Sequence, residues 1–143
     1  MGKTLVLAML AVLGLAGTAR ADPYDAWTLY ALHCMGCHQQ HGEGHGTVPQ
    51  LQGFVGHFLK VPGGREFLVQ VPGVAQSALT DDELAAVLNW TLLEFSRNEL
   101  PEDFRPYDGQ EVAGYRGGRL IDVIPVRARL LEEMRTRNII AGY

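Results

Sequence analysis

The chain has 143 residues, of which 47% are hydrophobic and 20% charged, and its formal net charge at pH 7 is −4. This length fits one compact domain, and the acidic balance argues against nucleic acid as a partner. The charge is uneven, because residues 22–104 carry 3 basic and 11 acidic side chains whereas residues 105–143 carry 7 and 5. This asymmetry either steers the chain towards a basic partner or is ordinary solvated surface.

The N-terminus has the pattern of a secretory signal peptide over residues 1–21. Lys3 is followed by an uncharged apolar run, residues 5–15, and then by Ala19-Arg20-Ala21, which predicts cleavage after Ala21. The apolar run is shorter than the roughly 20 residues that span a membrane, so no stable membrane span is expected after cleavage; an uncleaved anchor remains the alternative. The mature chain has 10 basic and 16 acidic residues, a net charge of −6.

A short motif follows the first predicted helix of the mature chain. Asp22-Pro23 is typical of an N-cap followed by proline at the first helical position, and the helix is expected over about 24–32. It leads into Cys34-Met35-Gly36-Cys37-His38, a C-x-x-C-H sequence and the attachment signature of a c-type haem. Each thiol can form a thioether bond to a vinyl group of one porphyrin, and the adjacent imidazole then supplies the proximal iron ligand. The sequence therefore predicts one covalently bound haem c, anchored by Cys34 and Cys37 and ligated by His38.

Two other interpretations of the cysteine pair stay open. Cysteines at this spacing form redox disulfides in thioredoxin-like proteins, although no strand–helix–strand pattern precedes Cys34. They could also bind zinc together with His38 and His41, although this spacing is tighter than that of a zinc finger and the chain lacks a second cysteine pair. Haem attachment is the preferred interpretation.

The middle of the chain alternates loops and short apolar segments. Residues 39–53 predict a loop, because Gly42, Gly44 and Gly46 interrupt any helix. The next segments are expected, in order, as an apolar segment packed on the haem or the core (54–59), a short helix (65–70) and a return to loop (71–73).

The clearest helix begins after Thr80. Thr80 and Glu83 form a predicted capping box. An apolar stripe at three- and four-residue steps follows, made of Leu84, Val87, Leu88, Thr91, Leu92 and Phe95. The stripe needs a partner, and the helix before C-x-x-C-H is the obvious one. Residues 98–118 are rich in proline, glycine and charge and predict an extended linker. A last helix is expected over about 125–137; it either packs across the preceding domain or docks on another protein.

In this order of elements, residues 24–96 resemble a class I c-type cytochrome. The resemblance rests on C-M-G-C-H, the glycine loop, Pro49-Gln50-Leu51-Gln52-Gly53 and the capped helix after Leu79. It implies an all-α cytochrome c fold, in which a few short helices surround one covalently bound haem, followed here by a C-terminal helical extension. The implied division is a haem domain over 22–97 and a linker with extension over 98–143. Pro49, Leu51 and Gly53 are expected to shape the wall of the haem crevice.

One departure from the family concerns the distal iron ligand. Such cytochromes commonly use a methionine within a Met-Pro dipeptide before the last helix, whereas this chain has Val71-Pro72, and no methionine lies between Met35 and Met134. His57 is the leading distal candidate, and bis-histidine ligation would lower the reduction potential. The family also implies an alternative role for His57, contact with a haem propionate. The side chain could otherwise simply lie at the protein surface.

The resemblance implies an electron carrier rather than an enzyme. Bacterial c-type cytochromes are matured outside the cytoplasm, so the expected compartment is the periplasm. The expected partners are a periplasmic dehydrogenase as donor and an oxidase or other respiratory acceptor. The alternative is a haem enzyme or a gas or redox sensor with an open distal position, for example a peroxidase, although Arg65 is the only arginine near enough in sequence to assist such chemistry.

Overall fold

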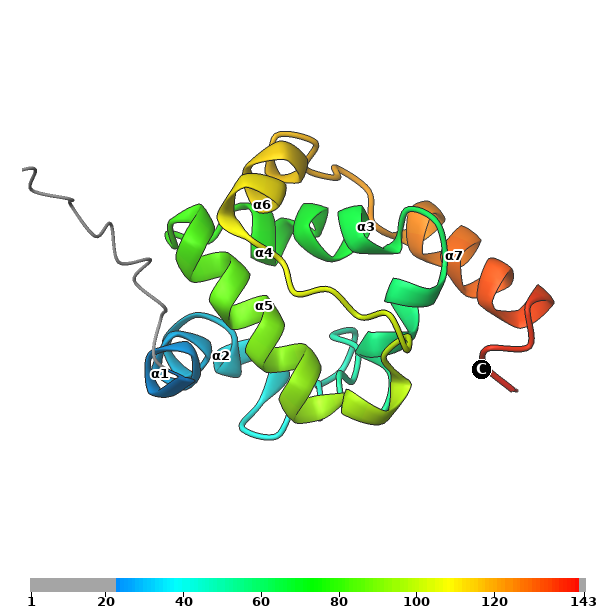
Figure 1. Ribbon diagram of the computed structural model, residues 1–143, viewed down its shortest axis with the longest axis horizontal. Helices are drawn as coiled ribbons and strands as arrows, with labels where there is room; N and C mark the ends of the chain where they lie inside the picture. Colours follow the sequence, from blue (N-terminus) through cyan, green and yellow to red (C-terminus); the bar gives the residue numbers. More distant parts are fainter. Residues whose placement is uncertain (1–22, 142–143) are drawn as a thin grey trace, which may run out of the picture.

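The computed structural model describes residues 23–141, so the predicted signal peptide, residues 1–21, lies outside the described residues. Within residues 23–141 the regular structure is helical, with one isolated β-bridge between His45 and Val48, and the expected all-α fold class is confirmed (Figure 1). The elements in chain order are α1 Pro23–His33, α2 Met35–His38, η1 Val55–Lys60, α3 Gly64–Gln70, α4 Pro72–Ala75, α5 Asp81–Phe95, η2 Arg97–Glu99, α6 Gly109–Arg116 and α7 Ile124–Thr136, where η marks a 3-10 helix. No helix among these is both long and apolar enough to cross a membrane.

Helices α1 and α5 pack against each other, as the sequence predicted (Figure 1). Three aromatic rings meet at their contact: the ring centroid of Tyr30 lies 5.1 Å from that of Trp90 and 5.3 Å from that of Phe95. Trp90 and Phe95 are themselves 5.3 Å apart in an edge-to-face arrangement. Such pairs contribute about 0.5–1.5 kcal/mol each beyond the burial of their area. This contact holds the residues just before the C-x-x-C-H motif against the end of α5.

The start of α5 has the predicted capping box. The Thr80 hydroxyl oxygen accepts from the Glu83 backbone N–H at 3.3 Å, and the Glu83 carboxylate accepts from the Thr80 backbone N–H at 2.8 Å. The apolar stripe of the helix faces the core, with five buried members: Leu84, Val87, Leu88, Thr91 and Leu92. The local sequence therefore fixes both the beginning of α5 and the side that it buries.

Two segments expected to be irregular contain helices instead. Pro72 begins the one-turn helix α4 where a loop was expected over 71–73, because proline suits the first helical position. The prediction of an extended linker over 98–118 is also wrong, because helix α6 forms within this segment and packs on α3 and α5. The Asp108 carboxylate caps α6 by accepting from the Glu111 backbone N–H at 2.8 Å. Gly109 lies against Asp82 of α5, so a side chain at this position would require the Asp82 carboxylate to move.

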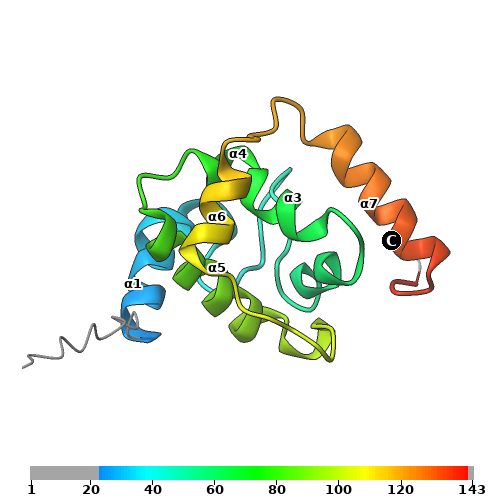
Figure 2. The same ribbon diagram turned by 45° about the horizontal axis from the view of Figure 1, so that its top comes forward.

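The last helix, α7, packs against η1 and α3 (Figure 2). Its buried residues are Leu130, Leu131 and Met134, and Leu130 and Met134 are fully enclosed. With this apolar face α7 packs across the preceding domain, which is one of the two roles expected for it. The C-terminal part of the chain, through α6 and α7, therefore covers α3 and α5 rather than extending away from them.

Candidate functional site

The C-x-x-C-H motif lies on a helical turn at the end of α1. The backbone N–H of Cys34 donates to the Tyr30 carbonyl at 2.8 Å, and those of Cys37 and His38 donate to the Cys34 carbonyl at 3.1 and 3.0 Å. This turn brings both thiols and the imidazole together within five residues. Both cysteines are free, Cys34 half-buried and Cys37 exposed.

The imidazole of His38 is held in one orientation. Its Nδ1 lies 3.2 Å from the carbonyl oxygen of Pro49. A carbonyl oxygen only accepts hydrogen bonds, so Nδ1 carries the proton and the lone pair of Nε2 remains available to a metal. Burial lowers the pKa of His38, and the hydrogen bond to Pro49 partly opposes this. The hydrogen bond to Pro49 thus leaves Nε2 as the nitrogen that can bind a metal.

The glycine loop, residues 39–53, places the carbonyl oxygen of Pro49 next to the imidazole of His38. Gly42 and Gly44 have φ of +74°, and a side chain at Gly44 would collide with the Val48 carbonyl. The Gly44 N–H donates to the His38 carbonyl at 3.2 Å, which closes the loop back onto the motif. The loop was expected from its glycines, but only the structure shows that it orients the histidine.

The three residues predicted to line a crevice wall belong to the same loop. Pro49 is exposed and supplies the carbonyl for His38, whereas Leu51 is half-buried and packs on the core. Gly53 has φ of +60°, and its N–H donates to the carbonyl of Phe95 at the end of α5, at 2.7 Å. The loop is therefore fixed at one end to the C-x-x-C-H turn and at the other to α5.

The environment of the Cys34 thiol differs from that of a reactive redox thiol. Burial, reinforced by Cys37, raises the pKa of the Cys34 thiol to about 11. Redox-active thiols have lowered pKa values that favour the thiolate, so the disulfide interpretation gains no support. Among residues 23–141, no three histidine, cysteine, aspartate or glutamate side chains gather into a metal-binding group, so the zinc interpretation gains none either.

His57 lies on η1 and has a buried nitrogen to satisfy. Its Nδ1 is buried and finds no hydrogen-bond partner within the described part of the chain. Its ring packs edge-to-face on Phe54, with centroids 5.8 Å apart. Burial, and next the charge of Lys60, lower the pKa of His57, while Glu99 acts in the opposite direction. A buried polar atom without a partner fits a polar group of a bound cofactor.

The positions of Met35 and Met134 also bear on the distal ligand. Met134 is fully enclosed in the core on α7, and Met35 lies half-buried between the two cysteines. Met134 thus has the role of a core residue. His41, the fourth residue of the alternative zinc interpretation, is exposed in the glycine loop, as is His45.

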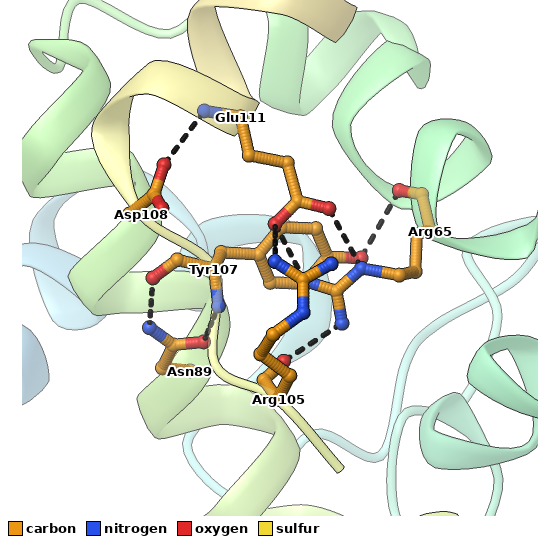
Figure 3. Close-up of polar contacts among 6 residues, drawn as sticks. All are labelled: Arg65, Asn89, Arg105, Tyr107, Asp108 and Glu111. Atoms are coloured by element: carbon orange, nitrogen blue, oxygen red, sulfur yellow. Dashed lines mark hydrogen bonds and ion pairs between the residues drawn. The ribbon is translucent and has the colours of Figure 1, made fainter. Parts of the chain in front are cut away.

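Arg65, which sequence reasoning considered for peroxidase-like chemistry, is fully engaged elsewhere (Figure 3). Its guanidinium donates to both carboxylate oxygens of Glu111, at 2.8 and 2.7 Å, and to the carbonyl of Arg105 at 2.8 Å. It also lies 4.1 Å above the ring centroid of Tyr107. Sequence reasoning did not find this network, because its partners lie 40 or more residues from Arg65.

An all-helical fold with a C-x-x-C-H turn at the end of its first helix, and with a histidine whose Nε2 is free, defines the class of small helical haem proteins. No family model matches the chain. Cytochrome c-552 from Thermus thermophilus is 35% identical to it over 104 aligned positions, covering 59% of this chain and 79% of the relative. A second cytochrome c-552, from a named strain of that species, is also 35% identical over 104 positions, covering 70% of its own length. The chain belongs to the c-type cytochromes, and its cofactor is covalently bound haem c.

Proposed function

We propose that this protein is an exported class I cytochrome c that carries one haem and passes single electrons between redox proteins of the periplasm. A periplasmic dehydrogenase is the proposed donor, and an oxidase or another respiratory protein is the proposed acceptor. The observation that carries the proposal is the geometry at His38: Nδ1 is bound to the Pro49 carbonyl, which leaves Nε2 free beside two free thiols on the same turn.

In this proposal Cys34 and Cys37 form the thioether bonds and Nε2 of His38 binds the iron. When bound, the haem supplies a one-electron couple between iron(III) and iron(II). Electron transfer needs no acid, base or nucleophile from the chain. The residues have to hold the ligand geometry constant in both oxidation states, and the hydrogen bond from His38 to the Pro49 carbonyl does this on the proximal side.

The two attachment points differ in exposure in a way that suits an electron carrier. Cys34 is half-buried and packs on the core, whereas Cys37 is exposed. Cys34 would therefore hold the haem against the apolar interior, and Cys37 would hold it at the surface. Bound in this way, the haem would supply the one-electron couple at a position that a partner protein can approach.

His57 is proposed to contact a haem propionate. Its buried Nδ1, unpartnered among residues 23–141, is the reason, because a carboxylate oxygen would satisfy it. The competing role is the distal iron ligand. Replacement of His57 by alanine separates the two: the low-spin spectrum persists if His57 binds a propionate and is lost if it binds the iron. His45→Ala, in the exposed part of the glycine loop, is the matched control.

A second candidate function is a gas or redox sensor with an open distal iron position. The observation that favours it is the lack of any methionine between Met35 and Met134, together with the enclosure of Met134 in the core. A peroxidase is less well supported, because Arg65 is committed to Glu111, Tyr107 and the Arg105 carbonyl and is not free to assist peroxide cleavage.

The test uses protein purified from its native host. Mass spectrometry should give the mass of the polypeptide from Asp22 plus one haem; the bare peptide mass would contradict the proposal. Visible spectra of the reduced protein are then recorded with and without carbon monoxide. Sharp low-spin bands unaffected by the gas support the electron carrier, and rapid binding at neutral pH supports the sensor.

A further inference from the structure

Arg116, at the C-terminal end of α6, is surrounded by the segment that joins α4 to α5, residues 75–81, called here the connecting segment. Its guanidinium donates to five acceptors along this segment: the carbonyl oxygens of Ala75 (2.9 Å), Ser77 and Leu79 (2.8 Å), Oδ1 of Asp81 (2.8 Å) and, at 3.5 Å, Oγ of Ser77. Arg116 thus donates hydrogen bonds to every second residue from the end of α4 to the start of α5.

A second contact holds the chain just before this segment. The backbone N–H of Leu120, shortly after α6, donates to the carbonyl of Gln70 at the end of α3, at 3.0 Å. Gly118 lies so close to the Gln70 side chain that a Cβ there would collide with it. Val71-Pro72 therefore lies between two hydrogen-bonded positions, Gln70 and Ala75. The donors at both positions, Leu120 and Arg116, belong to the C-terminal extension.

The connecting segment has little structure of its own. Helix α4 is a single turn, and residues 77–79 form bends rather than a helix. The arginine side chain presents five N–H donors in a rigid planar fork and keeps its charge at all physiological pH values. A side chain of this kind can hold three carbonyls and a carboxylate in one fixed arrangement, which a lysine cannot do.

We propose that Arg116 is a positioning residue of the haem site, which fixes the connecting segment on the distal side and so limits the access of external ligands to the iron. The inference rests on the proposed function and on the resemblance described above, by which Val71-Pro72 stands where related cytochromes have a Met-Pro dipeptide. Where a methionine binds the iron, that bond itself ties this part of the chain to the haem. Here Val71 cannot make such a bond, so the position of the segment depends on contacts such as those of Arg116.

The experiment measures carbon monoxide association with the reduced holoprotein by flash photolysis. Arg116→Ala should bind the gas about tenfold faster than the wild type, or begin to bind it if the wild type does not, because loss of charged hydrogen bonds raises the population of open conformations. Arg116→Lys should lie between the two. The matched control is Arg137→Ala, which removes an exposed ion pair to Glu133 on α7 (2.6 Å) without touching the segment, and it should behave as the wild type.

A second readout covers the case in which Arg116→Ala yields too little holoprotein. The amides of Gln76 and Ser77 donate to the carbonyls of Pro72 and Val74, at 3.0 and 3.1 Å. Their hydrogen exchange should be faster in Arg116→Lys than in the wild type and in Arg137→Ala. Wild-type protection in Arg116→Lys would overturn the inference.

The outcomes separate this inference from the proposed function. A wild-type protein without haem overturns both. Haem-loaded Arg116 variants that bind carbon monoxide at the wild-type rate overturn the role of Arg116 alone and leave the electron carrier standing. Faster binding in these variants, with Arg137→Ala unchanged, supports the role of Arg116.

Discussion

The guanidinium of Arg65 and the carboxylate of Glu111 form a two-point ion pair, with nitrogen–oxygen distances of 2.8 and 2.7 Å, that joins α3 to α6 (Figure 3). The pair is largely shielded, with 20% and 11% of the two side chains exposed. Paired, planar hydrogen bonds of this kind fix geometry as well as adding energy. The contact therefore makes α6 part of the same folded body as α3 and α5.

Replacing Glu111 by glutamine should destabilise the holoprotein by about 2 kcal/mol, because a shielded guanidinium then loses its charged partner. The measurement is denaturant unfolding followed by the Soret absorbance and by circular dichroism. The control is Glu133→Gln, which removes an exposed ion pair to Arg137 and should cost less than about 1 kcal/mol. Equal losses in the two variants would contradict a special role for the Arg65–Glu111 pair.

The same pair predicts a loss of stability in acid. Hydrogen bonding from Arg65 holds the pKa of Glu111 below its usual value, against the opposing effect of burial. A carboxyl group whose pKa is lowered by folding contributes its full stabilisation above the pKa of the unfolded chain, and loses it as the pH falls through the folded-state value. The difference in unfolding free energy between the wild type and Glu111→Gln should therefore be largest near neutral pH and shrink below about pH 4. A difference that stayed constant down to pH 3 would show that the charge of Glu111 is not its source.

The parts of the site that the sequence predicts are those determined by local spacing. C-x-x-C-H places two thiols and an imidazole within one helical turn wherever the chain folds as a helix, and the Thr80–Glu83 capping box is complete within four residues. The contact of His38 with Pro49 lies within one short loop as well, but the sequence did not predict it, because its geometry depends on the positive φ values of Gly42 and Gly44. These features need no information from distant parts of the chain.

Helix α6 and the role of Arg116 could not be predicted in this way. The sequence of α6 contains two glycines, which disfavour a helix in isolation. Its stability comes from the full burial of Val112 and from the ion pair of Glu111 with Arg65, 46 residues away. The acceptors of Arg116 are likewise 35 to 41 residues distant. Tertiary contacts of this range leave no periodic pattern in the sequence.

The capping box of α5 allows a test of cooperation between its two side chains. Thr80→Ala should cost about 1 kcal/mol in unfolding free energy, because the Glu83 backbone N–H loses its acceptor. Glu83→Gln should cost less, since its amide oxygen can still accept from the Thr80 backbone N–H. The double variant should lose less than the sum of the single losses, because the two side chains also hydrogen-bond each other at 2.8 Å. Strict additivity in this cycle, measured by denaturant unfolding, would show that the two caps act independently.

Asn89 provides the clearest test of how the segment before α6 is held on the domain. Its side-chain amide donates to the Tyr107 carbonyl at 2.9 Å and accepts from the Tyr107 N–H at 2.8 Å, so it pairs with both backbone groups of one residue. Asn89→Ala should destabilise the holoprotein by about 2 kcal/mol, since two backbone groups of the buried Tyr107 lose their partners. Asn98→Ala, at an exposed position in η2, is the control and should stay within about 0.5 kcal/mol of the wild type. Hydrogen exchange at the Tyr107 amide should accelerate in Asn89→Ala, and wild-type protection at that amide would mean that other contacts hold the segment in place.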